Sequence, residues 1–136
     1  MFSLFGKRYE ARRLDRDTQA IIRSDELAYR PDHLERIAAL VNEYLEQASA
    51  TGSTEPVATP NWLKIVHREA RKQHDQARLS AATLVIIYLR ARQLGEDGAP
   101  VCRNIDSSVA KWRSAPALAG TAETDPERSP SDSESL

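Results

Sequence analysis

The sequence predicts an all-α protein, a small three- to four-helix bundle with a long third helix. Three observations lead to this prediction. Apolar residues recur at steps of three and four along most of residues 7–94, which is the spacing of one face of an α-helix. The five Gly and seven Pro lie mostly outside residues 61–94. No segment alternates as a strand does, and the aliphatic run 84–89 has polar helical sequence on both sides.

Two helices are expected in the first half of the chain. Residues 7–29 carry apolar side chains at helical spacing, and Pro31 ends this segment because the residue before a proline avoids helical geometry. Asp32 and Glu35 then resemble a capping pair at the start of a second helix. The apolar stripe of this second helix covers residues 34–48, and it is the most strongly patterned element of the chain.

The third helix is expected to be the longest. Residues 50–59 have no periodic pattern and form a predicted loop, in which Thr59 supplies a cap and Pro60 a first-turn proline for the next helix. Because no Gly or Pro follows before residue 95, residues 60–94 are expected to form one helix about 50 Å long. A break near residues 79–80 is the alternative.

The last part of the chain changes in composition. Residues 105–113 are expected to form a short fourth helix, anchored by Val109 and Trp112. From Ser114 onward the chain consists of small and acidic residues with almost nothing to bury, which is typical of disorder. We therefore expect one helical domain over residues 1–113 and a disordered acidic tail over residues 114–136.

The net charge of -1 hides a division of charge along the chain. Residues 25–59 hold seven acids and two bases, whereas residues 60–94 hold seven bases and two acids. Opposite charges attract most strongly where they are close and partly shielded from water. The two segments are therefore expected to complement each other electrostatically.

The sequence carries no pattern typical of a catalytic, cofactor or metal site. His67 and His74 are seven residues apart, which separates them by about 10 Å along a helix, too far to share a zinc ion. Cys102 is the one cysteine, and no family signature surrounds it. A glycine-rich phosphate loop, a nucleophile elbow and a zinc-protease motif are also missing from the sequence. We expect no enzymatic activity, no cofactor and no metal.

A row of basic residues is the first candidate site. Lys64, Arg68, Arg71 and Lys72 fall within about a third of the circumference of a helix, beside its apolar face. Such a row is most often a solvated surface, but it also fits the phosphates of a nucleic acid. The acidic tail and the small positive charge of the remaining chain argue against a dedicated nucleic-acid binder.

The aliphatic segment 79–89 is the second candidate. Its apolar side chains lie nearly all round the helix, with Leu79, Ile86 and Ile87 pointing away from the main apolar face. Packing on one side cannot bury such a helix. It is expected either to be the central helix of the bundle or to meet another chain through these three residues.

The sequence also bears on location. No export signal is expected, because apolar residues precede basic ones at the N-terminus, and the longest apolar run is about half of a membrane span. Residues 1–5 offer at most a weak membrane contact, so a membrane partner is not expected. A single cysteine fits a reducing cytoplasm. The high arginine and alanine content is typical of a GC-rich bacterial genome.

By elimination, the sequence predicts a small non-catalytic cytoplasmic adaptor or regulatory protein. It is expected to act through helix-mediated contacts with a protein partner, and a homodimer is one form of such contact. The alternative is a nucleic-acid-associated accessory protein that binds phosphates through the basic helix face. The sequence does not name the partner.

Overall fold

The computed structural model describes residues 4–49 and 59–122, and the side chains of residues 6–49 and 59–113. The predicted all-α class is confirmed, since the regular elements of these ranges are all helical. Parts of three sequence predictions, on residues 1–3, 50–58 and 123–136, lie outside the described residues. The elements are α1 (Leu4–Ala28), α2 (Pro31–Ser49), α3 (Asn61–Lys72), α4 (Gln76–Gln93), the 3-10 helix η1 (Gly95–Gly98) and α5 (Ala99–Ala122).

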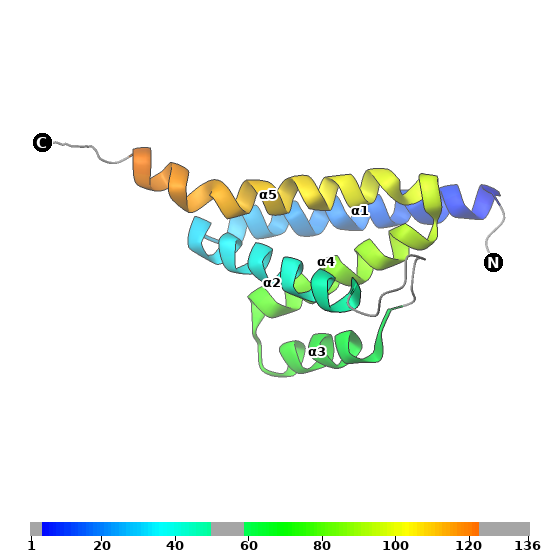
Figure 1. The fold of residues 1–136 in the computed structure, drawn as a ribbon, viewed down its shortest axis with the longest axis horizontal. Helices are drawn as coiled ribbons and strands as arrows, with labels where there is room; N and C mark the ends of the chain where they lie inside the picture. The colour runs from blue at the N-terminus through cyan, green and yellow to red at the C-terminus, as the bar shows by residue number, and fades with distance from the viewer. Residues whose placement is uncertain (1–3, 50–58, 123–136) are drawn as a thin grey trace, which may run out of the picture.

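The helices are arranged around α4. Helices α1 and α5 lie side by side along the long axis, and α2 packs against both α4 and α5 (Figure 1). Helix α3 lies at the outer edge of the molecule and packs on α4 (Figure 1). Because α4 contacts α1, α2, α3 and α5, it occupies the central position that its apolar circumference favoured.

The core collects side chains from every α-helix. Helix α4 buries small residues beside large ones, which lets neighbouring helices approach closely. Trp112 of α5 is 1% exposed, and its ring nitrogen donates to Glu26 Oε2 of α1 at 2.8 Å. The largest fully buried side chains include Leu14, Ile37, Leu63, Leu84, Leu89, Ile105 and Trp112.

The predicted long third helix over residues 60–94 is wrong. Helix α3 ends at Lys72, Gln73 caps it, and His74 adopts a φ of 57°, the left-handed region. Asp75 then caps α4 by accepting a hydrogen bond from the backbone N–H of Arg78 at 3.2 Å. The chain therefore turns back and packs α3 on α4. The alternative break near residues 79–80 falls inside α4.

The last helix is longer than expected. Helix α5 begins at Ala99 rather than at residue 105, with Pro100 in its first turn, where the missing N–H is not needed. It is helical to Ala122 and so runs past residue 113, where the fourth helix was expected to end. The disordered acidic tail over residues 114–136 stays a prediction. The described chain thus has five α-helices instead of three or four.

The expected attraction between residues 25–59 and 60–94 takes a different form. The ion pair that joins the two segments is Arg36 to Asp75, at 3.3 Å, so the base comes from the acidic segment. Arg78 reaches α2 through a hydrogen bond to the hydroxyl of Tyr44 at 3.1 Å. No described ion pair joins an acid of residues 25–49 to a base of residues 61–94. Apolar packing, this ion pair and this hydrogen bond therefore join the two segments.

Candidate functional site

A groove lies between α1 and α3, with α4 as its floor, and we call it the α1–α3 groove. It has a volume of about 490 Å³. Thr83, Ile86 and Ile87 of α4 form the floor. Helix α3 contributes His67. The α1 wall and the α4 end of the groove are completed by Arg13, Leu14, Asp17, Ala20, Ile21 and Arg90.

Helical spacing explains why these side chains meet. On α4, residues 83, 86, 87 and 90 follow the steps of three and four that place side chains on one face. The residues of α1 that line the groove follow the same steps. Each helix thus turns a single stripe toward the groove.

The apolar part of the groove is only partly covered. Leu14 is 1% exposed and Ile87 is 7% exposed, so both belong to the core beneath the groove. Ile21 and Ile86 are partly buried and pack against that core. Ile86 therefore offers apolar surface to a ligand from the floor, and Ile21 offers it from the wall.

The charges at the edge of the groove are not balanced. Arg13 of α1 donates to Glu10 Oε1 at 3.0 Å and lies 3.6 Å from Asp17, so Asp17 already has a cation beside it. Arg90 is exposed, and no ion pair is found for it among the described residues. The edge formed by α4 is therefore basic.

His67 faces the groove as a neutral side chain. Burial and the nearby cation of Arg71 both lower the pKa of His67 below its ordinary value. The imidazole is therefore uncharged at neutral pH. It contributes a polar but not an ionic contact to the α3 side of the groove.

The predicted basic row lies on the exposed side of α3 and reaches this edge. Lys64 and Arg71 stand three residues before and four residues after His67, so they share its side of the helix. Arg68 and Lys72 lie further round toward solvent. All four are exposed, and none takes part in an ion pair within the described part of the chain.

The two candidate sites from the sequence thus come together in part. Ile86 and Ile87 lie in the groove, whereas Leu79 lies two turns before Ile86 on the same face of α4 and does not line it. Sequence reasoning missed the wall formed by α1. The apolar stripe of α1, which includes Leu14 and Ile21, was visible, but a single sequence does not show which helices flank α4.

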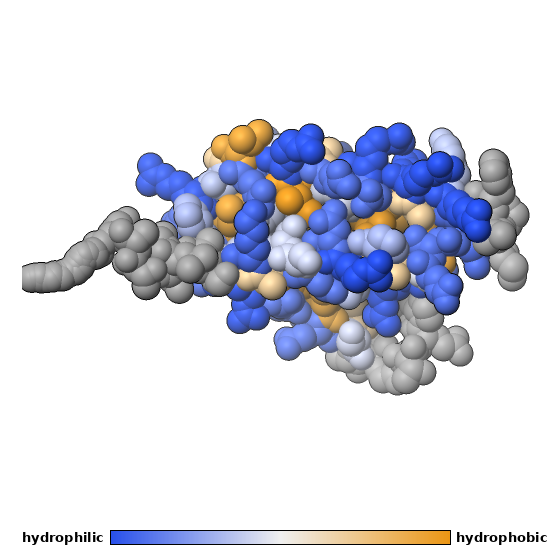
Figure 2. Space-filling model, turned by 90° about the horizontal axis from the view of Figure 1, so that it is seen from above, coloured by the Kyte–Doolittle hydropathy of each residue, from blue (hydrophilic) through white to orange (hydrophobic). Residues whose placement is uncertain are grey.

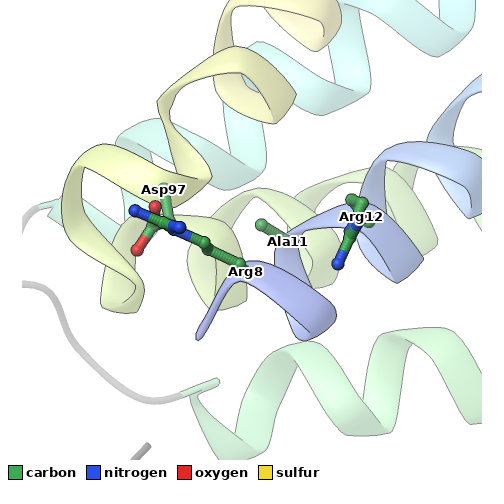
Figure 3. A pocket seen from close by; sticks show the side chains of 4 residues that line it. All are labelled: Arg8, Ala11, Arg12 and Asp97. Atoms are coloured by element: carbon green, nitrogen blue, oxygen red, sulfur yellow. The ribbon is translucent and has the colours of Figure 1, made fainter. Parts of the chain in front are cut away.

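A second hollow lies between α1 and η1 and is shown in Figure 3. It has a volume of about 430 Å³ and is lined by Arg8, Ala11, Arg12 and Asp97. The side chain of Arg8 extends from α1 toward η1, where Asp97 lies (Figure 3). Ala11 is the one apolar residue of this lining, so the hollow gives a ligand little surface to bury. The α1–α3 groove is the stronger candidate.

Two side chains with raised pKa values, Asp25 and Cys102, lie outside both hollows. Asp25 of α1 is 6% exposed, and burial raises its pKa to about 6. Its Oδ1 accepts a hydrogen bond from Ser80 at 3.2 Å. Burial likewise raises the pKa of Cys102 to about 11, so this thiol is almost fully protonated at neutral pH and is a poor nucleophile.

The upper face of the molecule, formed by α1 and α5, is mostly hydrophilic. Figure 2 shows its apolar side chains as small separate spots among polar ones. Such spots are ordinary for a protein surface. Among the described residues, the face seen in Figure 2 shows no single continuous apolar patch.

Three further findings bear on function. Among the described residues, no three His, Cys, Asp or Glu side chains come together as a metal site would require. None of the helices in the described ranges combines the length and the apolar content of a membrane span. No protein-family model, curated protein or solved structure matches this chain.

Proposed function

We propose that the chain is a small non-catalytic adaptor or regulatory protein of the cytoplasm, and that it binds a protein partner through the α1–α3 groove. One observation carries this proposal. The central helix α4 is covered by four other helices, yet Thr83 and Ile86 remain accessible between α1 and α3. A partner helix that lies in a groove between two helices buries such residues with ordinary helix packing.

The test compares two variants that add the same charge. Ile86→Glu places a carboxylate on the floor of the groove, whereas Leu27→Glu changes a side chain that is 83% exposed and outside it. Each chain is used to capture proteins from cells of the source organism, and a captured protein is then purified and titrated by calorimetry. We expect binding to the unmodified chain and to Leu27→Glu, and its loss in Ile86→Glu.

A second copy of the chain is one partner to be examined in the same way. Light scattering over a range of concentrations gives the oligomeric state of the unmodified chain and of Ile86→Glu. A dimer that dissociates only in Ile86→Glu would assign the groove to self-association. The proposed function is contradicted if the chain stays monomeric and no purified partner needs Ile86 for binding.

Nucleic-acid binding is a second candidate function. The observation in its favour is that the four exposed cations of α3 have no ion pair among the described residues. Binding to duplex and single-stranded DNA is titrated against salt, because released counterions make such binding fall steeply as salt rises. Arg68→Glu with Arg71→Glu is compared with Arg103→Glu with Arg113→Glu, a pair of exposed arginines on α5. Equal affinity of the two double variants would remove this candidate.

A further inference from the structure

We infer that the α1–α3 groove selects an acidic amphipathic helix of another protein. This inference rests on the proposed function and adds the chemical class of the partner. Two features of the groove carry it, the apolar floor with partly exposed isoleucines and the excess of unpaired cations along its edges.

The floor determines the apolar side of the partner. Ile86 lies on α4 and Ile21 on α1, so the accessible apolar surface runs between two helices rather than forming a closed pocket. A rod-shaped ligand with apolar side chains along one face fits such a surface better than a compact molecule does. An α-helix with apolar residues at steps of three and four presents that face.

The edges determine its polar side. Helix α3 lines the groove through His67, and Lys64 and Arg71 lie one turn before and one turn after it without lining the groove themselves. Arg90 lines the groove at its α4 end. Asp17, the carboxylate of the groove lining, already lies beside Arg13. The unpaired cations therefore lie on the α3 side and at the α4 end of the groove, and carboxylates on a bound helix would be attracted to these two places.

The chain's own acidic segments fit this description poorly. Residues 123–136 contain five acids but only one large apolar residue, Leu136, so they match the edges and not the floor. Helix α2 is acidic and amphipathic, but its apolar face is buried against α4 and α5. A second copy would have to unfold to present that face, which favours a different protein as the occupant.

The experiment uses three fluorescent peptides of equal length and the full chain of 136 residues. The first is a helical peptide with leucine at steps of three and four and glutamate on its other faces. The second replaces each glutamate by lysine, and the third has the composition of the first in an order without an apolar face. Fluorescence anisotropy measures their binding at low and at high salt. We expect the first peptide to bind best and to weaken as salt rises.

Two pairs of variants separate the floor from the edges. Ile86→Glu is expected to abolish binding of the first peptide, while Leu27→Glu leaves it unchanged. The double variant Lys64→Glu, Arg71→Glu is expected to lower the affinity for the first peptide about tenfold and to raise the affinity for the lysine peptide. The double variant Arg103→Glu, Arg113→Glu changes the net charge by the same amount at positions outside the groove. It is therefore expected to change the affinity for either peptide less than the Lys64→Glu, Arg71→Glu variant does.

The outcomes separate this inference from the proposed function. If the first peptide fails to bind, or binds no better than the lysine peptide or the reordered peptide, the acidic class of partner is wrong. The proposed function then still stands wherever a purified partner needs Ile86. If the first peptide binds but Ile86→Glu has no effect, the groove is not the binding surface and both proposals fail. Removal of residues 123–136 that strengthens peptide binding more than tenfold would show that the tail occupies the groove, which also contradicts this inference.

Discussion

At the scale of single residues, Asp25 of α1 is a buried carboxylate that is only partly hydrogen-bonded. It is 6% exposed, its Oδ1 is held by Ser80, and its Oδ2 is buried without a hydrogen-bond partner. The hydroxyl of Ser80 favours the charged form, but burial outweighs it and raises the pKa. Tyr29, directly after the end of α1, has its own pKa raised mainly by burial and also by the charge of Asp25. A charged Asp25 therefore destabilises the fold.

We predict that Asp25→Asn stabilises the protein above pH 6. The pKa of Asp25 is about 6 in the folded chain against an ordinary 3.8, so the folded state holds this proton more tightly than the unfolded state. The stability that Asp25 contributes is complete below its ordinary pKa and is lost as pH rises through 6. Near pH 8 the variant should gain up to about 3 kcal/mol in the free energy of unfolding, since one pKa unit corresponds to about 1.4 kcal/mol.

Urea unfolding at several pH values measures this effect. The gain of Asp25→Asn should shrink as pH falls and vanish near 3.8, the ordinary pKa. Asp15→Asn, at a partly exposed position of the same helix, is the control. A gain that is equal at all pH values would mean that the charge of Asp25 is not the cause.

The two glycines of η1 lead to a second prediction at this scale. A Cβ on Gly98 would lie 1.9 Å from the carbonyl oxygen of Ala91, a backbone atom that cannot move without shifting α4. Gly98→Ala should therefore lower the free energy of unfolding by more than about 2 kcal/mol. Gly95 has a φ of 66° and open space around it, so Gly95→Ala should cost only about 1 kcal/mol. Urea unfolding measures both variants, and a larger loss of unfolding free energy in Gly95→Ala than in Gly98→Ala would contradict this explanation.

At the scale of elements, sequence patterns predict helices well but not the turn between α3 and α4. The proline at residue 31 and the apolar stripe of α2 placed that helix correctly. The turn after α3 contains neither Gly nor Pro, and His74 adopts the left-handed conformation that a glycine usually supplies. Asp75 was the available signal, because Asp is a good helix cap. The residues on both sides of Asp75 are polar and favour a helix, so the sequence predicted one uninterrupted helix despite this signal.

We predict that Asp75→Ala destabilises the α3 to α4 turn. Asp75 caps α4 and also pairs with Arg36 at 3.3 Å and Arg78 at 3.4 Å. Loss of a helix cap costs about 1 to 2 kcal/mol, whereas partly exposed ion pairs contribute less than about 1 kcal/mol. Asp75→Asn keeps the cap and loses the charge, so it should cost less than Asp75→Ala. Thermal unfolding measures both, with Glu46→Ala on the exposed side of α2 as the control.

At the scale of the whole molecule, the groove shows what sequence alone leaves open. Residues 13–21, 67 and 83–90 form it from three helices, and no pattern in the chain indicates that α1 and α3 flank α4. The surplus of apolar residues on α4 and the basic row of α3 were visible, because each belongs to one helix. The sequence did not show that these two features lie close together, because their proximity depends on the turn at residues 73–75, which brings α3 back along α4.

The same turn makes α3 the least anchored helix, and this leads to a prediction for the whole molecule. Helix α3 has 12 residues, a length that is marginal for an isolated helix, and it packs mainly on α4, with Trp62 against Tyr44 of α2. Regions with few buried contacts open at lower free energy than the core. In hydrogen exchange followed by mass spectrometry, amides of α3 should exchange at least about tenfold faster than those of α4.

A ligand in the α1–α3 groove should reduce the difference in amide exchange rate between α3 and α4. Because His67 and the α3 edge contact the groove, a bound acidic peptide holds α3 closed and should slow its exchange more than that of α2, which lies outside the groove. Leu63 of α3 is fully buried, so Leu63→Ala should speed exchange in α3 without the same change in α5. Equal protection of α3 and α4 in the free chain would show that the molecule opens as one cooperative unit. The groove would then be a rigid surface, with no loosely held wall to close over its ligand.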